Sequence, residues 1–338
     1  MKILGIETSC DETSASIVEN TTSYETVKIL SNVVTSSLAL HSKTGGIVPE
    51  VAAREQVKYI IPVIDKALHL VESINAIAVT VGPGLIGSLL VGVETAKTLA
   101  YVWKKPIIPV NHLIGHIYAN FIGEISNDSI PNFPSLALIV SGGHTDLVLM
   151  KNHGKIKWLG GTRDDAGGEA FDKIGRLLGL PYPGGPSIEK AAKNGNPKAF
   201  NFPRPMIDSD DFDFSFSGLK TAVLREFKAM KQLNNETIAD LAASVQEAIV
   251  DVLVSKTLNA AQKYKVKSIL LSGGVAANQA LRNRFKLEIG NWKLEIPFFV
   301  PEKWLCTDNA AMIATAAFFN YKPTHWSKIT ANPELYFN

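Results

Sequence analysis

Two histidines one helical turn apart, His112 and His116, are the clearest candidates for chemistry in this 338-residue chain. They follow an apolar run at 106–110, which predicts a buried strand, and they lie in a helix that we expect over 111–124. A spacing of four residues puts both imidazoles on one helix face, about 6 Å apart along the axis. This arrangement allows both rings to bind one metal ion.

The pair alone does not establish a metal site, because histidines at this spacing are often ordinary packing or surface residues. No glutamate follows His112, so the H-E-x-x-H pattern of zinc proteases is absent. Asp308, at the start of a small-residue helix near 308–320, is a candidate third ligand; its alternative roles are a helix cap or a first-turn acid. Two histidines and one aspartate with open positions suit iron or zinc, and the residue types do not decide between them.

Composition restricts the class of protein. With 338 residues, 46% of them hydrophobic, the chain can bury a large core and suggests about two domains. A net charge of +2 does not demand a nucleic-acid partner, although it leaves room for a local basic surface. Cys10 and Cys306 lie far apart with no leader before them, which predicts a reducing, cytoplasmic setting. The apolar runs are too short for a membrane segment.

Two similar strand-turn-strand patterns open the two halves of the chain. The first places the polar turn 9–13 between apolar strands, and the second places the Ser-Gly-Gly-His-Thr turn 141–145 between two more. Glycines let the backbone approach a phosphate closely and point N–H groups at it. Each turn alone is typical of a surface hairpin, but together they suggest a duplicated fold with a ligand between its halves.

Four other segments offer possible contacts. Asp172 comes one turn into a helix that begins among acidic residues, where its carboxylate could hold a ligand hydroxyl. Asn278 follows a second Ser-Gly-Gly at a strand-to-helix junction and could read a base or ribose edge. The acidic and aromatic segment 208–220 predicts either a partner surface or an edge strand. The strand-turn-helix at 76–104 contains a glycine-rich turn that matches neither G-x-G-x-x-G nor the P-loop, so it indicates an anion site or close packing equally.

Basic residues give no continuous tract for nucleic acid. Five of them could contribute to a phosphate-binding surface, although scattered lysines and arginines on solvated helices explain them as well. These residues are Lys228, Lys231, Arg282, Arg284 and Lys286.

With these residues assembled, the chain resembles the TsaD family, the tRNA N6-adenosine threonylcarbamoyltransferases once called O-sialoglycoprotein endopeptidases. The matching motifs cover nearly the whole chain: 5–13, His112 with His116, 141–145, 167–173, 216–221 and 308–309. The resemblance implies an α/β fold of the actin/hexokinase/Hsp70-like (ASKHA) type, with two RNase H-like lobes and the active site in the cleft between them. We expect the lobes at 1–130 and 131–338, with the helix near 308–320 packing back on the first lobe.

The resemblance also implies the site residues. The metal ligands would be His112, His116 and Asp308, holding one divalent ion per subunit, with iron(II) expected ahead of zinc. The adenylate and substrate contacts would lie in the loops 139–145 and 272–278 and beside them: Ser9, Ile139, Val140, Ser141, Gly142, Gly143, Asp172, Gly185, Glu189 and Asn278. Two positions depart from the family pattern, because Glu189 stands where many bacterial members have Asp and Gln56 where members commonly have His.

The implied reaction moves the threonylcarbamoyl group from threonylcarbamoyl-AMP to N6 of the adenosine just 3′ of the anticodon in ANN-decoding tRNAs. Asp11 or Glu12, at the tip of the first hairpin, would position or deprotonate the attacking amine. The implied partners are tRNA, a TsaB-like paralogue and a TsaE-like ATPase, and the turn with His144 indicates a bacterial or organellar member.

Other functions remain as alternatives. A small-molecule O-carbamoyltransferase or a sugar kinase would share this fold. The missing glutamate beside His112 argues against a metalloprotease, and the presence of all three candidate ligands argues against a non-catalytic scaffold. A chaperone or cytoskeletal module would need interaction domains for which this length leaves no room.

Overall fold

The computed structural model describes residues 1–338 except 21–26, 70, 124–129, 231–233 and 338. The chain forms two compact units, one of residues 1–131 with 301–338 and the other of residues 132–300. The structure therefore divides the chain differently from the expected split after residue 130. The terminal segment returns to the first unit because its helix α11 (Ala310–Phe319) packs against strands of that unit's sheet.

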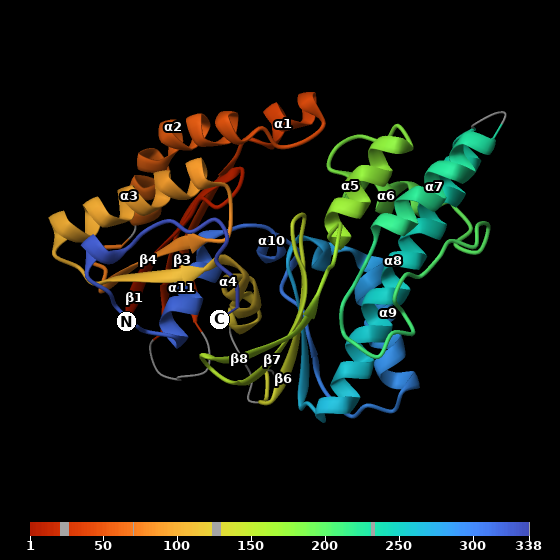
Figure 1. Cartoon of the computed structure of the whole chain (residues 1–338). Helices are drawn as coiled ribbons and strands as arrows, with labels where there is room; N and C mark the ends of the chain where they lie inside the picture. The colour runs from red at the N-terminus through yellow and green to blue at the C-terminus, as the bar shows by residue number, and fades with distance from the viewer. Residues whose placement is uncertain (21–26, 70, 124–129, 231–233, 338) are drawn as a thin grey trace. The chain divides into compact units, whose positions relative to one another are not determined.

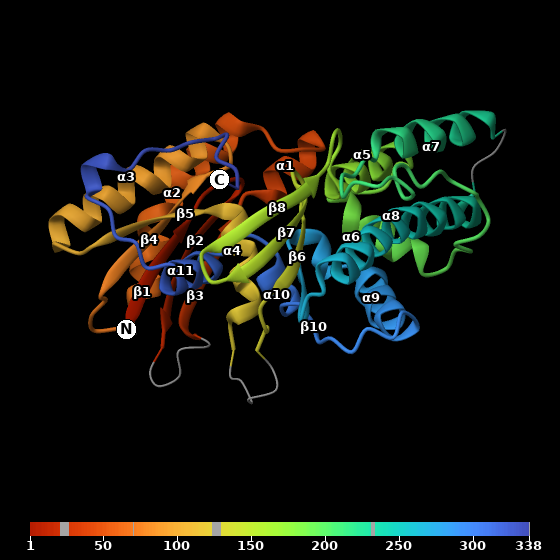
Figure 2. The same cartoon turned by 60° about the horizontal axis from the view of Figure 1, so that its bottom comes forward.

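The first unit is built on a five-stranded mixed sheet in the order β3-β2-β1-β4-β5 (Figure 1). Its strands are β1 (Lys2–Glu7), β2 (Glu12–Glu19), β3 (Lys28–Ser36), β4 (Ala76–Gly82) and β5 (Ile107–Asn111). Helices α2 (Pro49–Leu68) and α3 (Ile86–Trp103) cover one face of the sheet, and α11 covers the other (Figures 1 and 2). Because both faces are covered, β1 and β4 read as nearly continuous apolar runs.

The described part of the first unit also contains the short helices α1 (Leu38–Thr44), α4 (His112–Tyr118) and α10 (Lys303–Cys306). It has 3-10 turns at η1 (Ala119–Phe121) and, near the C-terminus, at η3 (Trp326–Lys328). The predicted helix 111–124 is thus shorter in the structure: Asn111 precedes it, and residue 124 lies outside the described residues. Pro49 begins α2 at a position where its missing N–H is not needed.

The second unit repeats this sheet, in the order β10-β9-β6-β7-β8. Its strands are β6 (Ser135–Val140), β7 (Thr145–Asn152), β8 (Lys155–Gly161), β9 (Ser268–Ser272) and β10 (Phe298–Phe299). Its helices are α5 (Gly167–Leu177), α6 (Gly184–Ala192), α7 (Ser217–Ala229), α8 (Asn235–Tyr264) and α9 (Gln279–Asn291), with the 3-10 turn η2 (Gly274–Ala277) before α9. Figure 2 shows the long α8 running beside α6 and α9.

The duplication predicted from the two hairpins is present in both sheets. β1 and β6 each pair antiparallel with the next strand along the chain, and each pairs on its other side with a parallel strand. The two central strands thus end at a tight turn that leads into their antiparallel neighbours. This topology is the α/β ASKHA arrangement that the sequence predicted.

The acidic and aromatic segment before α7 is largely packed inward. Phe214 and Phe216 are fully buried, and Phe214 forms one isolated bridge with Thr162. The Asp164 carboxylate accepts hydrogen bonds from the Ser215 hydroxyl (2.5 Å) and the Phe216 N–H (2.8 Å). Residues 208–216 are therefore a loop held by hydrogen bonds and one isolated bridge, and they do not form the edge strand that was one of the two expectations.

None of the described helices combines the length and the apolar character that a bilayer crossing requires.

Close packing of α11 on β1 depends on Gly5. A Cβ at Gly5 would lie 2.2 Å from the carbonyl oxygen of Ala310 and 3.0 Å from the Ala314 Cβ. At the start of α11, the Ala310 N–H also donates to the Ser14 hydroxyl of β2 (2.9 Å). A missing side chain on β1 and a hydroxyl on β2 together fix where α11 begins.

We predict that Gly5→Ala lowers the free energy of unfolding by about 2–3 kcal/mol, because the added methyl forces α11 away from the sheet. Denaturant titration measures this change. Gly290→Ala in α9, where a Cβ meets no atom within 4 Å, is the control and should leave stability unchanged or raise it by about 0.5–1 kcal/mol. Equal stability of Gly5→Ala and the wild type would contradict the packing argument.

Candidate functional site

The two histidines are presented by the junction between β5 and α4. Asn111, the last residue of β5, accepts hydrogen bonds from the main-chain N–H groups of Leu113 (2.8 Å) and Ile114 (3.3 Å). This side-chain cap starts the helix at His112 without an intervening loop. His112 and His116 are 7% and 1% exposed, and their ring centroids lie 4.6 Å apart.

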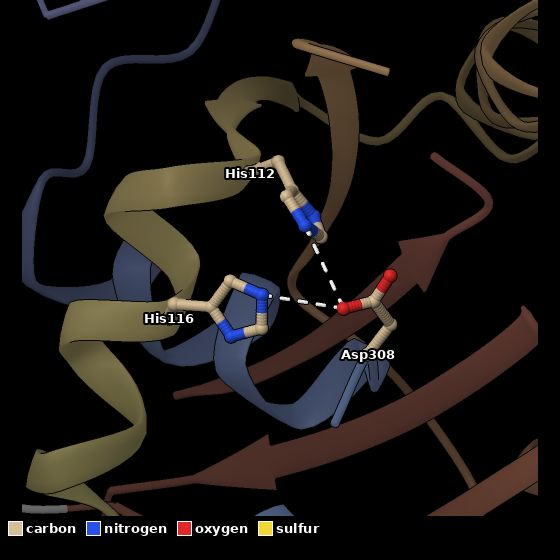
Figure 3. Close-up of side chains that lie close together, drawn as sticks. All are labelled: His112, His116 and Asp308. Carbon is tan, nitrogen blue, oxygen red and sulfur yellow. Dashed lines mark ion pairs between the residues drawn. The ribbon is translucent and has the colours of Figure 1, made fainter. Parts of the chain in front are cut away.

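Asp308 faces both histidines, as Figure 3 shows. Its Oδ1 atom lies 3.2 Å from His116 Nε2 and 3.6 Å from His112 Nε2, and the three ligand atoms all lie within 4.8 Å of one another. The helix-cap alternative for Asp308 is wrong, because the Asn309 side chain caps α11 by accepting from the Met312 N–H (3.1 Å). Asp308 is also outside the first turn of α11.

The chemistry of this trio fits a divalent metal ion. Neither ring nitrogen of the buried His116 has a hydrogen-bond partner among the described residues, although its Nε2 lies within ion-pair distance of Asp308. His112 Nδ1 lies 3.1 Å from both the Glu7 carboxylate and the Ser9 hydroxyl, which leaves Nε2 on the side of Asp308. Metal-binding histidines usually hold their second nitrogen on a carboxylate in this way.

The first hairpin turn brings further acids to the trio. Burial, together with the negative charges of Asp308 and Asp11, raises the pKa of Glu12 well above its ordinary value. Burial and the charge of Asp308 likewise raise the pKa of the Cys10 thiol. Ser9, expected as a substrate contact, lies with its hydroxyl against His112. Both cysteines are free thiols.

In the second unit, the expected adenylate loop lies at the end of β6. Ile139 and Val140 are fully buried, so their side chains belong to the core and only their main chain can serve a ligand. The turn that follows is closed by the Ser141 N–H, which donates to the His144 carbonyl (2.8 Å). Gly142 and Gly143 leave open space where a Cβ would stand.

The N-terminus of α5 approaches this turn closely. The Gly168 N–H donates to the Ser141 carbonyl (3.2 Å), and a Cβ at Gly168 would lie only 2.4 Å from that oxygen. The glycine therefore permits contact between the helix start and the turn, and helix N-termini favour anions.

The remaining expected contacts link α5, α6 and α9. Asp172 accepts from the Gly184 N–H (2.7 Å), and its burial raises the pKa of its carboxyl. A Cβ at Gly185 would meet open space. Glu189 accepts from the first main-chain N–H of α9, that of Gln279 (2.8 Å). Asn278 caps α9 through its oxygen and donates its amide to Gln246 (2.8 Å), so it has structural roles that its place in the sequence did not reveal.

Comparison with known proteins decides the family. Residues 28–315 match the family model described as TsaD, tRNA N6-adenosine threonylcarbamoyltransferase. The chain belongs to the TsaD family. Curated members with that name include those of Moorella thermoacetica, 48% identical over 99% of this chain and 97% of the relative, and Thermomicrobium roseum, 51% identical over 94% of this chain and 92% of the relative. A member from Dehalococcoides mccartyi strain ATCC BAA-2100 is 52% identical over 95% of this chain and 94% of the relative.

Solved structures of more distant proteins share the fold alone. A crystal structure of full-length HypF, in a phosphate- and nucleotide-bound form, superposes with a TM-score of 0.60 and 11% identity, covering 94% of this chain and 55% of HypF. T. kodakarensis HypF gives a TM-score of 0.61 and 13% identity over 94% of this chain and 47% of that protein. The chain thus spans about half the length of these HypF proteins.

Sequence reasoning missed Glu7 in this TsaD member. Its carboxylate is fully buried at the end of β1, accepts from the Thr80 hydroxyl (2.6 Å) and contacts His112. The available signal was an acid closing an otherwise apolar strand, since a fully buried carboxylate needs partners.

Two of the basic candidates for a phosphate-binding surface are engaged within the protein. Arg284 pairs with Glu247 and Asp251, and Arg282 donates to the Ala276 carbonyl (2.6 Å). Lys228 and Lys286 are exposed, and Lys231 lies outside the described residues.

We predict that His112 carries a proton at neutral pH in the metal-free protein. Burial lowers the pKa of its ring, but Asp308 and Glu7 outweigh burial and raise it from 6.5 to about 9. The resulting stabilisation is fully present below pH 6.5 and is lost as the pH rises through 9. Asp308→Asn should lower the pKa, which NMR titration of the ring nitrogens measures. Asp65→Asn, at an exposed position of α2, is the control; a pKa near 6.5 in the wild type would contradict the prediction.

Proposed function

We propose that this chain transfers the threonylcarbamoyl group from threonylcarbamoyl-AMP to N6 of the adenosine 3′ of the anticodon in ANN-decoding tRNAs, releasing AMP. The observation that supports it most is the convergence of His112, His116 and Asp308 beside an acidic turn, in a chain about half identical to curated members of the family over nearly its whole length.

We propose that the trio holds one divalent metal ion, with iron(II) ahead of zinc. Two imidazoles and one carboxylate are the ligand set of many iron(II) and zinc sites that keep positions open for substrate. When bound, such an ion would orient the acyl donor and offset negative charge developing on its carbonyl oxygen or departing phosphate. Glu7 would keep His112 in the ligating orientation by accepting a hydrogen bond from its Nδ1–H group.

The acidic turn supplies a base for the transfer. In the step, N6 of the adenosine bonds to the carbamoyl carbon, the bond from that carbon to the phosphate oxygen breaks, and one N6 proton must leave. Asp11 or Glu12 would position the amine and take that proton. The raised pKa of Glu12 makes its carboxylate a stronger proton acceptor than that of an ordinary glutamate.

The loops of the second unit would bind the adenylate. The turn after β6 presents Gly142 and Gly143 without side chains, next to the N-terminus of α5, so its main chain can approach a phosphate. Asp172, fixed at one oxygen by Gly184, would offer its carboxylate to a ribose hydroxyl, beside Gly185. We also propose that this chain acts together with a TsaB-like paralogue and a TsaE-like ATPase.

The decisive assay follows labelled threonine from synthesised threonylcarbamoyl-AMP into unmodified ANN-decoding tRNA, with and without the partner proteins. We expect label in the tRNA with the wild type and a loss of at least about 10²-fold with His116→Ala, together with loss of bound metal. His69→Ala, at an exposed position after α2, is the matched control and should behave as the wild type. No label with folded, metal-loaded protein under any partner combination would favour a small-molecule carbamoyltransferase or a sugar kinase.

Single-turnover transfer separates the two candidate bases. We expect Glu12→Gln or Asp11→Asn to slow the step by about 10²-fold or more while metal content stays unchanged, because removing a general base costs that much. Normal rates in both variants would exclude a role for either carboxylate as base.

A further inference from the structure

Every main-chain carbonyl from Thr8 to Glu12, the turn that carries the two candidate bases, is held from outside the turn. The Ser9 carbonyl accepts from the Leu85 N–H (2.8 Å), the Cys10 carbonyl from the Ser88 hydroxyl (3.0 Å), and the Asp11 carbonyl from the Ser37 N–H (3.1 Å) and hydroxyl (2.9 Å). Gln56 holds the remaining two and adds a second bond to Cys10.

Gln56 is the centre of this arrangement. Its Nε2 donates to the carbonyls of Thr8 (3.3 Å), Cys10 (3.1 Å) and Glu12 (2.9 Å), and the side chain is completely buried on α2. Its Oε1 is buried with no hydrogen-bond partner among the residues that the structure describes. Turning the amide over would place that oxygen against three carbonyl oxygens, so the observed orientation is the one that electrostatics allows.

A second side-chain system holds the Asp11 carbonyl, one of the two that Gln56 does not reach. The Val48 N–H donates to His41 Nδ1 (3.3 Å), so the proton of the neutral ring is on Nε2, which lies 3.0 Å from the Ser37 hydroxyl oxygen. Ser37 can then donate its own hydroxyl hydrogen to Asp11. These contacts tie the 8–12 turn both to α2 and to residues 37–48, the segment that leads into α2.

We infer that Gln56 is a positioning residue for the transfer step: it fixes the backbone of the 8–12 turn, and so the places of the Asp11 and Glu12 carboxylates beside His112, His116 and Asp308. The inference rests on the proposed function. The three hydrogen-bond partners of the Gln56 amide among the described residues are main-chain atoms, so its effect must pass through the backbone. A misplacement of about 1 Å in a catalytic group can cost about 10²-fold in rate, which makes such a fixture consequential.

Gln56→Leu tests this directly, because leucine fills similar space and donates nothing. We expect single-turnover transfer to fall at least about 10-fold, with metal content and the KM for tRNA unchanged. Amide hydrogen exchange across the turn should become faster. Gln262→Leu, the same substitution at an exposed position of α8, is the control. It should change neither the transfer rate nor the hydrogen exchange across the turn.

Gln56→Glu gives a readout that a merely space-filling role would not move. An ionised carboxylate cannot donate to the three carbonyls, but a protonated one can donate to one of them. The transfer rate of Gln56→Glu divided by that of Gln56→Leu should therefore rise as the pH falls. A ratio independent of pH would overturn the inference.

The remaining outcomes are equally decisive. A normal rate in Gln56→Leu, or a loss that only follows its metal content, overturns the positioning role. If the wild type shows no transfer at all, the proposed function fails by itself; faster exchange across 8–12 in Gln56→Leu then still supports the positioning of the turn, and unchanged exchange overturns it.

Discussion

Asp308 meets His112 and His116 only because the helix that follows it packs directly on the first sheet. Gly5 gives α11 room against β1, Ser14 of β2 holds its first N–H, and Asn309 caps it. These contacts come from three different parts of the chain. Without them the carboxylate would have no fixed relation to α4, and His112 would lose the larger of the two charges that raise its pKa.

Around this contact, the site is a balance between buried acids and buried imidazoles. Glu7 and Asp308 place negative charge against the buried ring of His112, and their combined effect is to favour positive charge on it. A divalent cation would satisfy the same demand without a proton, which is why the donor set and the surrounding acids point to one chemistry. Charged groups are costly to bury without partners, so these acids and imidazoles must be buried together.

Much of this could be predicted from the sequence. Apolar strands and the glycine turns predicted both hairpins and a duplicated fold, since each depends on local periodicity, whereas the ASKHA fold class came from the resemblance to the TsaD family. The expectation that the helix near 308–320 packs back on the first lobe came from the family resemblance and not from local periodicity, because that packing depends on a single missing Cβ at Gly5. The capping work of Asn278 and the carbonyl contacts of Gln56 also escaped, since one side chain's partners depend on elements far away in sequence. Glu189 reaches the start of α9 despite its departure from the family pattern.

The second unit interrupts the first, since residues 132–300 lie between its two segments. During synthesis, His112 and His116 are made long before Asp308, because all residues of the second unit are translated in between. A nascent or truncated chain therefore holds at most two of the three candidate ligands. Full coordination by the trio would report that translation has passed residue 308 and that the terminal helix has docked, so metal uptake would come late in the life of each new molecule.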